Sequence, residues 1–425
     1  MKTWRCLAWL GIVLILLASP AGAGGLWLYE NGTPDLGTAG AGRAAMALDA
    51  STAFGNPAGM TKLERSQFLG AFQLILPSIH FNVEAGSTFG RPGETGNAGV
   101  SLPSASGFYV HKISPDWRLG VSLLSYLGLG VQYSDQWAGR YYLQASRLLT
   151  MALIPSAAYK VNDWLSVGAG PTFIVGKLKQ SSAINKVLPP GAPDGRLTLN
   201  SWAFGVGGLA GVLLEPRQGT RFGVTYNSPV DLKFDDVVST DGPGPVLSAI
   251  LRTRGLLGSK VDMTYTIPQQ VMVSAYQQIT GKFSLMANFG WQNWSQFGKI
   301  NVSIESDNPT SLTADAKLKD TWHAAIGAQY RLAPAWLLSL GFAYDSSAVG
   351  DADRIPALPV DRQLRYAVGI QYDWNRDVTW GLAYEFADLG NAPINVHRGP
   401  LAGRLTGDYS PNHIQFVATN LIWKF

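Results

Sequence analysis

The residues whose types could support chemistry in this 425-residue chain are five histidines and a few serine and glycine motifs. A hydrolase of the phospholipase kind would need a serine beside a histidine on adjacent strands. The sequence contains no Gly-x-Ser-x-Gly, phosphate-binding loop or His-Glu-x-x-His pattern. The histidines are scattered over separate segments: His80, His111, His323, His397 and His413. We therefore expect no enzyme, no cofactor and no metal site.

Small residues dominate residues 36–63, which read LGTAGAGRAAMALDASTAFGNPAGMTKL. This composition suits a tightly folded segment in a confined space, where bulky side chains would not fit. We interpret the segment as a plug. A Gly/Ala-rich linker or a short soluble helix would have the same composition, and Asn56-Pro57 would end such a helix as an ordinary turn.

The first 23 residues have the three parts of a secretory signal, with a basic start, an apolar run and small residues at the cleavage site. The mature chain is expected to begin at Gly24. The single cysteine, Cys6, lies in the signal, so no disulfide is expected. Loss of Lys2 and Arg5 lowers the formal charge from +4 to +2, which gives no basis for binding nucleic acid.

Period-2 alternation dominates the chain after Arg65, with large apolar residues on one face and small or polar residues on the other. A soluble β-sandwich alternates in the same way, but charged residues make up only 15% of this chain, a balance typical of a β-rich protein that faces lipid. The alternation predicts fourteen strands, at residues 66–86, 99–113, 117–133, 142–160, 164–180, 197–215, 220–235, 259–279, 283–305, 311–332, 336–348, 362–374, 378–397 and 403–425.

The connections between these segments favour a transmembrane barrel. Short turns follow the even-numbered strands, whereas most gaps after odd-numbered strands are long and polar, as in outer-membrane barrels. Tryptophans cluster near the short turns, where their amphipathic rings suit a membrane interface. The chain ends on Phe425 after an alternating strand, which looks like the signal read by the barrel insertion machinery of the Gram-negative outer membrane.

Four motifs in the same order resemble the FadL/TodX family of outer-membrane transporters for hydrophobic compounds. They are the hatch sequence within residues 36–60, Trp137-Ala138-Gly139-Arg140-Tyr141, the segment 158–170, and Trp291 with Trp294-Ser295-Gln296-Phe297. The resemblance covers the whole mature chain. It implies an all-β fold, a transmembrane antiparallel β-barrel of about 14 strands with an N-terminal hatch in its lumen. The expected units are a signal peptide (1–23), the hatch (24–65) and the barrel (66–425).

The resemblance also implies a gate. Asn56, Pro57 and Ala58 match the hatch element that lies near an inward kink of the third strand, and the matching kink here contains Gly128 and Gly130. Two glycines in one strand permit a bend or bulge that leaves ladder groups unpaired, so the wall could open sideways. Ligands would then leave the barrel laterally into the membrane.

The expected ligand is a hydrophobic small molecule that crosses the polar lipopolysaccharide layer poorly. Fatty-acid members of the family hold the carboxylate with basic residues, but the two matching positions here are Ser182 and Ala314. Nearby cations could substitute, and the candidates are Lys177, Lys179, Lys317, Lys319 and Arg140. Long-chain fatty acids are the favoured substrates. Neutral or aromatic hydrocarbons are the alternative, and a general porin is a further one. The expected partners are this ligand, outer-membrane lipid with lipopolysaccharide, and the insertion machinery.

Overall fold

The computed structural model describes residues 30–87, 93–186, 192–237, 239–242, 244–245, 248–249, 260–305, 310–397 and 402–425. The expected signal peptide and the first residues of the expected hatch, 24–29, lie outside the described residues.

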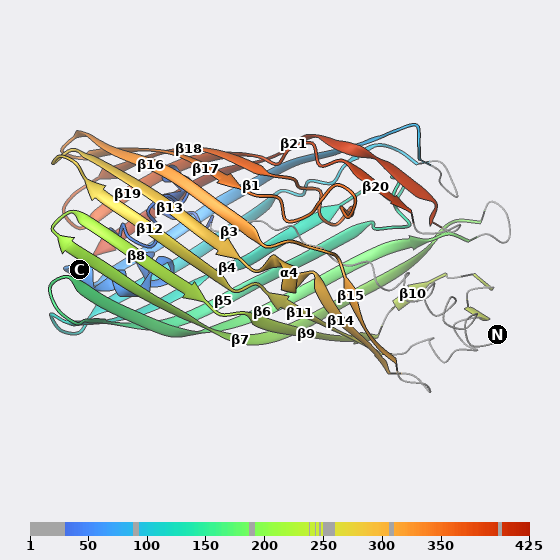
Figure 1. Ribbon diagram of the computed structural model, residues 1–425, viewed down its shortest axis with the longest axis horizontal. Helices are drawn as coiled ribbons and strands as arrows, with labels where there is room; N and C mark the ends of the chain where they lie inside the picture. Colours follow the sequence, from blue (N-terminus) through green and yellow to red (C-terminus); the bar gives the residue numbers. More distant parts are fainter. Residues whose placement is uncertain are drawn as a thin grey trace.

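Fourteen strands form a closed antiparallel barrel, in which every strand pairs with the next around the ring (Figure 1). Closure leaves no strand at a free edge of the sheet, as a sheet in lipid requires. The fourteen-stranded barrel expected from the sequence is confirmed. Its strands are β1 (Gln67–Val83), β3 (Leu102–Lys112), β4 (Trp117–Gln132), β5 (Ala145–Lys160), β6 (Leu165–Ile184), β7 (Gly195–Arg217), β8 (Thr220–Asn227), β12 (Gln270–Gln278), β13 (Phe283–Gln292), β16 (Thr321–Ala333), β17 (Trp336–Asp345), β18 (Gln363–Asp373), β19 (Val378–Asp388) and β21 (Arg404–Lys424).

A separate four-stranded sheet extends four neighbouring barrel strands at one end, in the order β15 (Thr310–Asp315), β14 (Lys299–Glu305), β11 (Lys260–Ile267) and β9 (Val230–Val237). The expectation of continuous strands over 220–235, 259–279, 283–305 and 311–332 is therefore wrong. Prolines break the first two, because Pro229 and Pro268 cannot donate to a ladder. The short helix α4 (Trp294–Phe297) breaks the third, and residues 316–320 break the fourth.

Three short strands lie beyond the barrel wall. They are β2 (Gly96–Asn97), β10 (Ser239–Asp241) and β20 (Ile394–His397), which pair with the outer parts of β1, β7 and β21. The expected strand 378–397 is accordingly two strands, β19 and β20. The short connections all lie at the end that carries the C-terminus, at the left of Figure 1, and the long ones at the opposite end.

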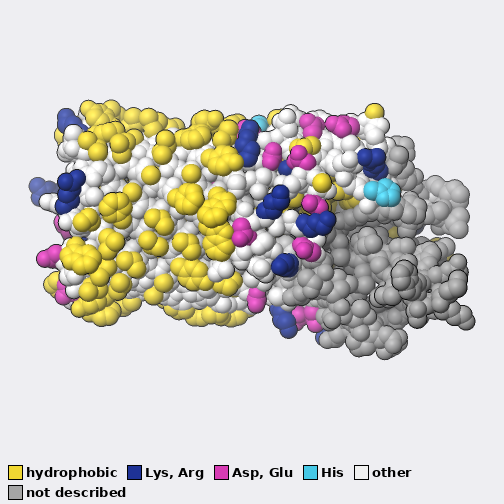
Figure 2. Space-filling model, viewed as in Figure 1, with side chains coloured by type: hydrophobic (Ala, Val, Ile, Leu, Met, Phe, Trp, Pro, Cys, Tyr) yellow, Lys and Arg dark blue, Asp and Glu magenta, His cyan; other side chains and the backbone are white. Residues whose placement is uncertain are grey.

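The outer face carries a broad apolar band (Figure 2). Large apolar side chains, which a soluble protein would mostly bury, point outward here: Ile326 is 64% exposed and Trp202 is 63% exposed. Charged side chains gather on the part toward the long loops. The tryptophans near the short turns are all on the outer face: Trp117, Trp164, Trp336, Trp374 and Trp380. This distribution is typical of a barrel that faces lipid.

The N-terminal part, residues 30–63, lies inside the barrel and is called the inner segment below. It contains two 3-10 helices, η1 (Pro34–Thr38) and η2 (Pro57–Lys62), and the single helical turn α2 (Thr52–Gly55). Separate wall strands hold it: the amide of Gly42 donates to Asn288 Oδ1 of β13 at 2.7 Å, and Asn420 Nδ2 of β21 donates to the carbonyl of Gly32 at 3.1 Å. Contacts on several sides fix the segment in the lumen.

Candidate functional site

Asn56 joins the inner segment to the barrel wall. Its side chain is fully buried, and its Nδ2 donates to the carbonyls of Ala44 at 2.6 Å and Val212 at 3.0 Å. Its Oδ1 accepts from the amide of Ala58 at 3.1 Å, so Asn56 also caps η2, which begins at Pro57. One amide side chain therefore connects two turns of the inner segment to strand β7.

Inward glycines of the wall provide the space that the inner segment occupies. A Cβ at Gly168 of β6 would lie 2.6 Å from the amide nitrogen of Ala58, and a Cβ at Gly369 of β18 would lie 2.9 Å from the Cα of Gly37. Real side chains do not tolerate such separations. The backbone of the inner segment therefore lies directly against these wall glycines, with no room for a side chain between them.

Strand β4 bends away from β3 in the segment that the sequence predicts. Pairing between them runs only from Lys112/Arg118 to Gly107/Leu123, while β4 continues to pair with β5 as far as Gln132. A register shift between Ser125 and Leu127 leaves Tyr126 as an extra residue, which is a β-bulge. The next backbone contact between these edges is the amide of Gln132 donating to Ala98 at 3.0 Å. We call this unpaired stretch of wall the β3–β4 gap.

The two predicted kink glycines lie along this gap. A Cβ at Gly128 would have no atom within 4 Å, whereas one at Gly130 would lie 3.4 Å from Cγ of Arg147. The bulge itself falls at Tyr126, two residues before Gly128. The structure thus places the bend at the start of the expected segment and leaves open space beside Gly128.

An aromatic contact connects the inner segment to the bulge. The ring of Phe54 in α2 lies 5.9 Å from the ring of Tyr126, edge to face, and the guanidinium of Arg43 lies 5.6 Å from the Phe54 centroid. Sequence reasoning missed this pair. A signal was present, because Phe54 is the sole aromatic residue between positions 30 and 63.

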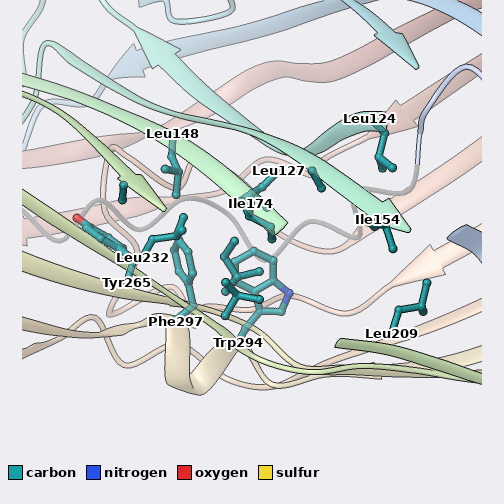
Figure 3. Close-up of a cluster of buried hydrophobic side chains, with 14 of the residues drawn as sticks. Leu124, Leu127, Leu148, Ile154, Ile174, Leu209, Leu232, Tyr265, Trp294 and Phe297 are labelled. Carbon is teal, nitrogen blue, oxygen red and sulfur yellow. The ribbon is translucent and has the colours of Figure 1, made fainter. Parts of the chain in front are cut away.

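Buried apolar side chains form a cluster that extends from α4 to the β3–β4 gap (Figure 3). Leu124 and Leu127 of β4 belong to it, and Tyr126 packs against it. At the other side Trp294 and Phe297 of α4 lie 5.0 Å apart between ring centroids. We call this set the apolar cluster; its labelled members are Leu124, Leu127, Leu148, Ile154, Ile174, Leu209, Leu232, Tyr265, Trp294 and Phe297.

The loop after β4, residues 133–144, packs across the outer ends of β1 and β21. The ring of Trp137 stacks on Tyr133 with centroids 3.8 Å apart, and the hydroxyls of Tyr133 and Tyr409 share a hydrogen bond of 2.7 Å. Burial raises the pKa of the Tyr133 phenol well above its ordinary value, so this group stays neutral. The loop thereby covers the outer end of the β3–β4 gap.

Arg140 lies in the same loop and is 3% exposed at its side chain. Its Nε bonds Asp194 Oδ2 at 2.9 Å. It lines a cavity of about 540 Å³ together with Asp135, Gln136, Gln144, Pro193, Asp194, Gly195, Arg196 and Asp241. This lining is polar, so the cavity does not match a purely apolar ligand.

The four candidate lysines lie away from the apolar cluster. Lys177 is on the outer face of β6, with its ammonium 4.9 Å from the ring centroid of Trp202, and Lys179 is exposed on the same face. Lys317 pairs with Asp353 at 3.1 Å beyond the barrel wall, and Lys319 is exposed beside it. The expectation that these lysines substitute for basic residues of an inner pocket does not fit their placement. Ser182, in contrast, faces inward and is buried.

A buried charge network lies in the lumen near the start of the inner segment. Arg365 Nε bonds Asp345 at 2.7 Å, its Nη1 bonds Glu385 at 2.7 Å, and it also pairs with Glu30. His323 Nδ1 lies 2.6 Å from Asp345. Through Glu30, this network links the inner segment to four neighbouring wall strands, β16 to β19.

In the described ranges, no group of three or more His, Cys, Asp or Glu side chains could hold a metal ion. Among the described residues, no helix has both the length and the apolar character needed to cross a membrane.

The closed barrel, its apolar outer face and its filled lumen define a class: membrane-spanning β-barrels whose lumen holds an N-terminal segment. A family model described as "Outer membrane protein transport protein (OMPP1/FadL/TodX)" matches residues 14–425, so the chain belongs to this family. The resemblance stated from the motifs is thus confirmed. The chain is an outer-membrane transporter of hydrophobic compounds, and the members of its family are transporters.

Known relatives span nearly the whole chain. A long-chain fatty acid transport protein of Escherichia coli O6:H1 is 27% identical over 401 residues, covering 87% of this chain and 88% of the relative. The crystal structure of a Pseudomonas aeruginosa FadL homologue has a TM-score of 0.82 at 22% identity, covering 93% of this chain and 98% of that one. The Ralstonia pickettii toluene transporter TbuX has a TM-score of 0.69 at 19% identity, covering 94% of this chain and 100% of that one.

Proposed function

We propose that this protein takes up long-chain fatty acids by passive diffusion, holding the ligand along the apolar cluster and releasing it sideways into the outer membrane. The observation that carries the proposal is the β3–β4 gap. It is an unpaired stretch of wall whose inner side is lined by Leu124 and Leu127 of the apolar cluster. A ligand leaving there passes from an apolar interior to lipid without crossing the polar loops.

Release requires a structural change in the lumen. A chain of about sixteen methylenes gains at most about 12 kcal/mol on burial, which would hold it too tightly for transport. Movement of the inner segment would alter the Phe54–Tyr126 contact at the bulge. We propose that this contact couples the position of Asn56, Pro57 and Ala58 to the width of the gap.

The substrate class rests on the relatives. The E. coli relative is named for long-chain fatty acids, and its similarity covers 87% of this chain. A long acyl chain also suits a cluster that extends from α4 to β4.

Neutral hydrocarbons are the second candidate, and one observation favours them. Buried arginines of the lumen are already bound: Arg118 to the carbonyl of Leu63 at 3.1 Å, Arg43 to Asp35 at 3.1 Å, and Arg365 to its three acids. A carboxylate would have to compete with these partners. The resemblance also places the neutral Ser182 and Ala314 at the two positions where fatty-acid members have basic residues.

The test is uptake of labelled oleate and labelled toluene by a Gram-negative host that lacks its own transporter of this family. A Gly128→Cys variant is assayed before and after reaction with a bulky maleimide. The side chain would enter open space, so the barrel should fold. Gly128 shares the outer face with Gly130 and Arg147, so the bulky adduct would lie at the outer side of the gap and obstruct exit there. We expect wild-type uptake before reaction and a fall of about tenfold afterwards.

Gly281→Cys is the matched control, because a Cβ there also meets no atom within 4 Å but the residue lies in a short turn at the other end. Its labelling should leave uptake unchanged. Full oleate uptake by labelled Gly128→Cys would overturn lateral release. Uptake of toluene without oleate would move the protein to the neutral-hydrocarbon candidate, and uptake of neither would refute both.

A further inference from the structure

Three basic side chains lie together on the outer face of the barrel wall. Arg147 of β5 is directly opposite Lys179 of β6 in the ladder, and Lys177 is two residues further along the same face. Opposed residues have Cβ atoms about 5 Å apart and diagonal neighbours about 7 to 8 Å. Like charges at these separations repel, so the arrangement costs stability unless an anion is bound. We call these three residues the basic patch.

The patch lies at the outer boundary of the apolar band. Leu165 begins β6 beside the short turn, and Lys177 lies twelve residues further along the strand. At about 3.3 Å per residue and a tilt of 35 to 45° this corresponds to about 30 Å along the barrel axis, against an apolar band about 25 Å tall. Trp202 and Phe204, 63% and 60% exposed on neighbouring β7, are placed as interfacial aromatics.

The positive charge of the patch is not neutralised by the described part of the protein. No described carboxylate lies within 4 Å of the cationic nitrogens of Arg147, Lys177 or Lys179, and their printed contacts are with Gln132 and the Trp202 ring. Two other cations of the barrel do have acids: Arg196 bonds Asp135 at 2.6 Å further out, and Arg331 bonds Asp373 at 3.1 Å. The patch is therefore distinguished by having three cations without a described acid side by side on one face.

We propose that the basic patch binds the phosphorylated headgroup of a lipopolysaccharide molecule in the outer leaflet. Guanidinium and ammonium groups donate charge-assisted hydrogen bonds to phosphate oxygens, and Arg147 can do so with two nitrogens. The apolar residues directly below, Met151 and Val175 among them, are 56% and 45% exposed and would contact the acyl chains. Headgroup and chains of one lipid match the two parts of this surface.

The position also places the bound lipid next to the β3–β4 gap. Arg147 pairs with Gly130 of β4, and the opposite edge of β4 at this level borders the β3–β4 gap. A lipid held here would occupy the leaflet immediately beside the gap.

The experiment measures lipid binding to the purified full chain in detergent, by native mass spectrometry during titration with bisphosphorylated lipid A. The variant is R147Q/K177Q/K179Q, and R147K/K177R/K179R keeps the charges. K282Q/R376Q is the matched control, because both residues lie in short turns at the opposite end. Heat-modifiable gel mobility checks that each variant is folded, and K177Q and K179Q are measured singly should the triple variant not fold.

We expect the neutral triple variant to raise the Kd for lipid A about tenfold or more, each single variant to raise it about threefold, and the charge-preserving and control variants to stay within about twofold of wild type. Dephosphorylated lipid A should bind wild type as weakly as lipid A binds the neutral variant. Equal binding by wild type and variant would overturn the proposal. So would displacement of lipid A by an equal concentration of pyrophosphate, because the site would then be one for free phosphate. Since uptake is not measured, the outcome is independent of the proposed transport function.

Discussion

Replacement of Asn56 by alanine tests whether this residue holds the inner segment in place. The change removes two donated hydrogen bonds, to Ala44 at 2.6 Å and Val212 at 3.0 Å, and one accepted from Ala58 at 3.1 Å. The fourteen-stranded ladder is untouched, because Asn56 contributes nothing to its pairing. The effect should therefore be confined to the inner segment.

The magnitude follows from these three bonds. A hydrogen bond contributes about 1 kcal/mol net, and a buried partner left unpaired costs somewhat more. Loss of all three amounts to about 3 kcal/mol. Since about 1.4 kcal/mol is a factor of ten in an equilibrium constant, the population of displaced inner segments should rise about a hundredfold.

Hydrogen exchange with mass spectrometry measures this population directly. Peptides covering residues 52–63 should exchange about a hundredfold faster in Asn56→Ala, while peptides from β1 and β21 stay unchanged. Asn162→Ala is the matched control, since Asn162 accepts from the amides of Trp164 and Leu165 in an exposed turn. Unchanged exchange in residues 52–63, or an equal rise in the wall strands, would refute the role assigned to Asn56.

Three further predictions concern the packing of the lumen. Gly223→Ala should lower the free energy of unfolding by about 1 to 3 kcal/mol, because its Cβ would overlap the carbonyl of Ala44 in the inner segment. Gly281→Ala should leave the free energy of unfolding unchanged, because its Cβ would meet no atom. Thermal unfolding in detergent measures both variants. Phe54→Ala should reduce oleate uptake severalfold without loss of folded barrel, because the Tyr126 contact is lost, and unchanged uptake would contradict the coupling. Arg365→Met should cost about 3 to 5 kcal/mol by leaving buried carboxylates without their cation, and a stability equal to wild type would show that the network is dispensable.

The sequence by itself determined the class of fold. Alternation of large apolar and small residues follows directly from the two faces of a strand. The short turns and the final Phe425 predicted which end of the barrel faces the periplasm. Small residues at 36–63 predicted a confined segment, and residues 36–63 are largely buried. The glycines near 128 predicted a bend in β4, and the register shift of that strand falls at Tyr126. These features are local, so a single sequence can express them.

Tertiary structure alone decided which faces and edges meet. Phe173, Ile174 and Val175 are consecutive apolar residues, so alternation in β6 could not indicate which side of the wall Lys177 occupies. The β3–β4 gap depends on where β3 stops pairing with β4, which is a relation between two strands and has no local signal. The contact between Phe54 and Tyr126 depends on how the inner segment is placed in the lumen. Such relations arise from packing between distant segments, which spacing along one chain does not express.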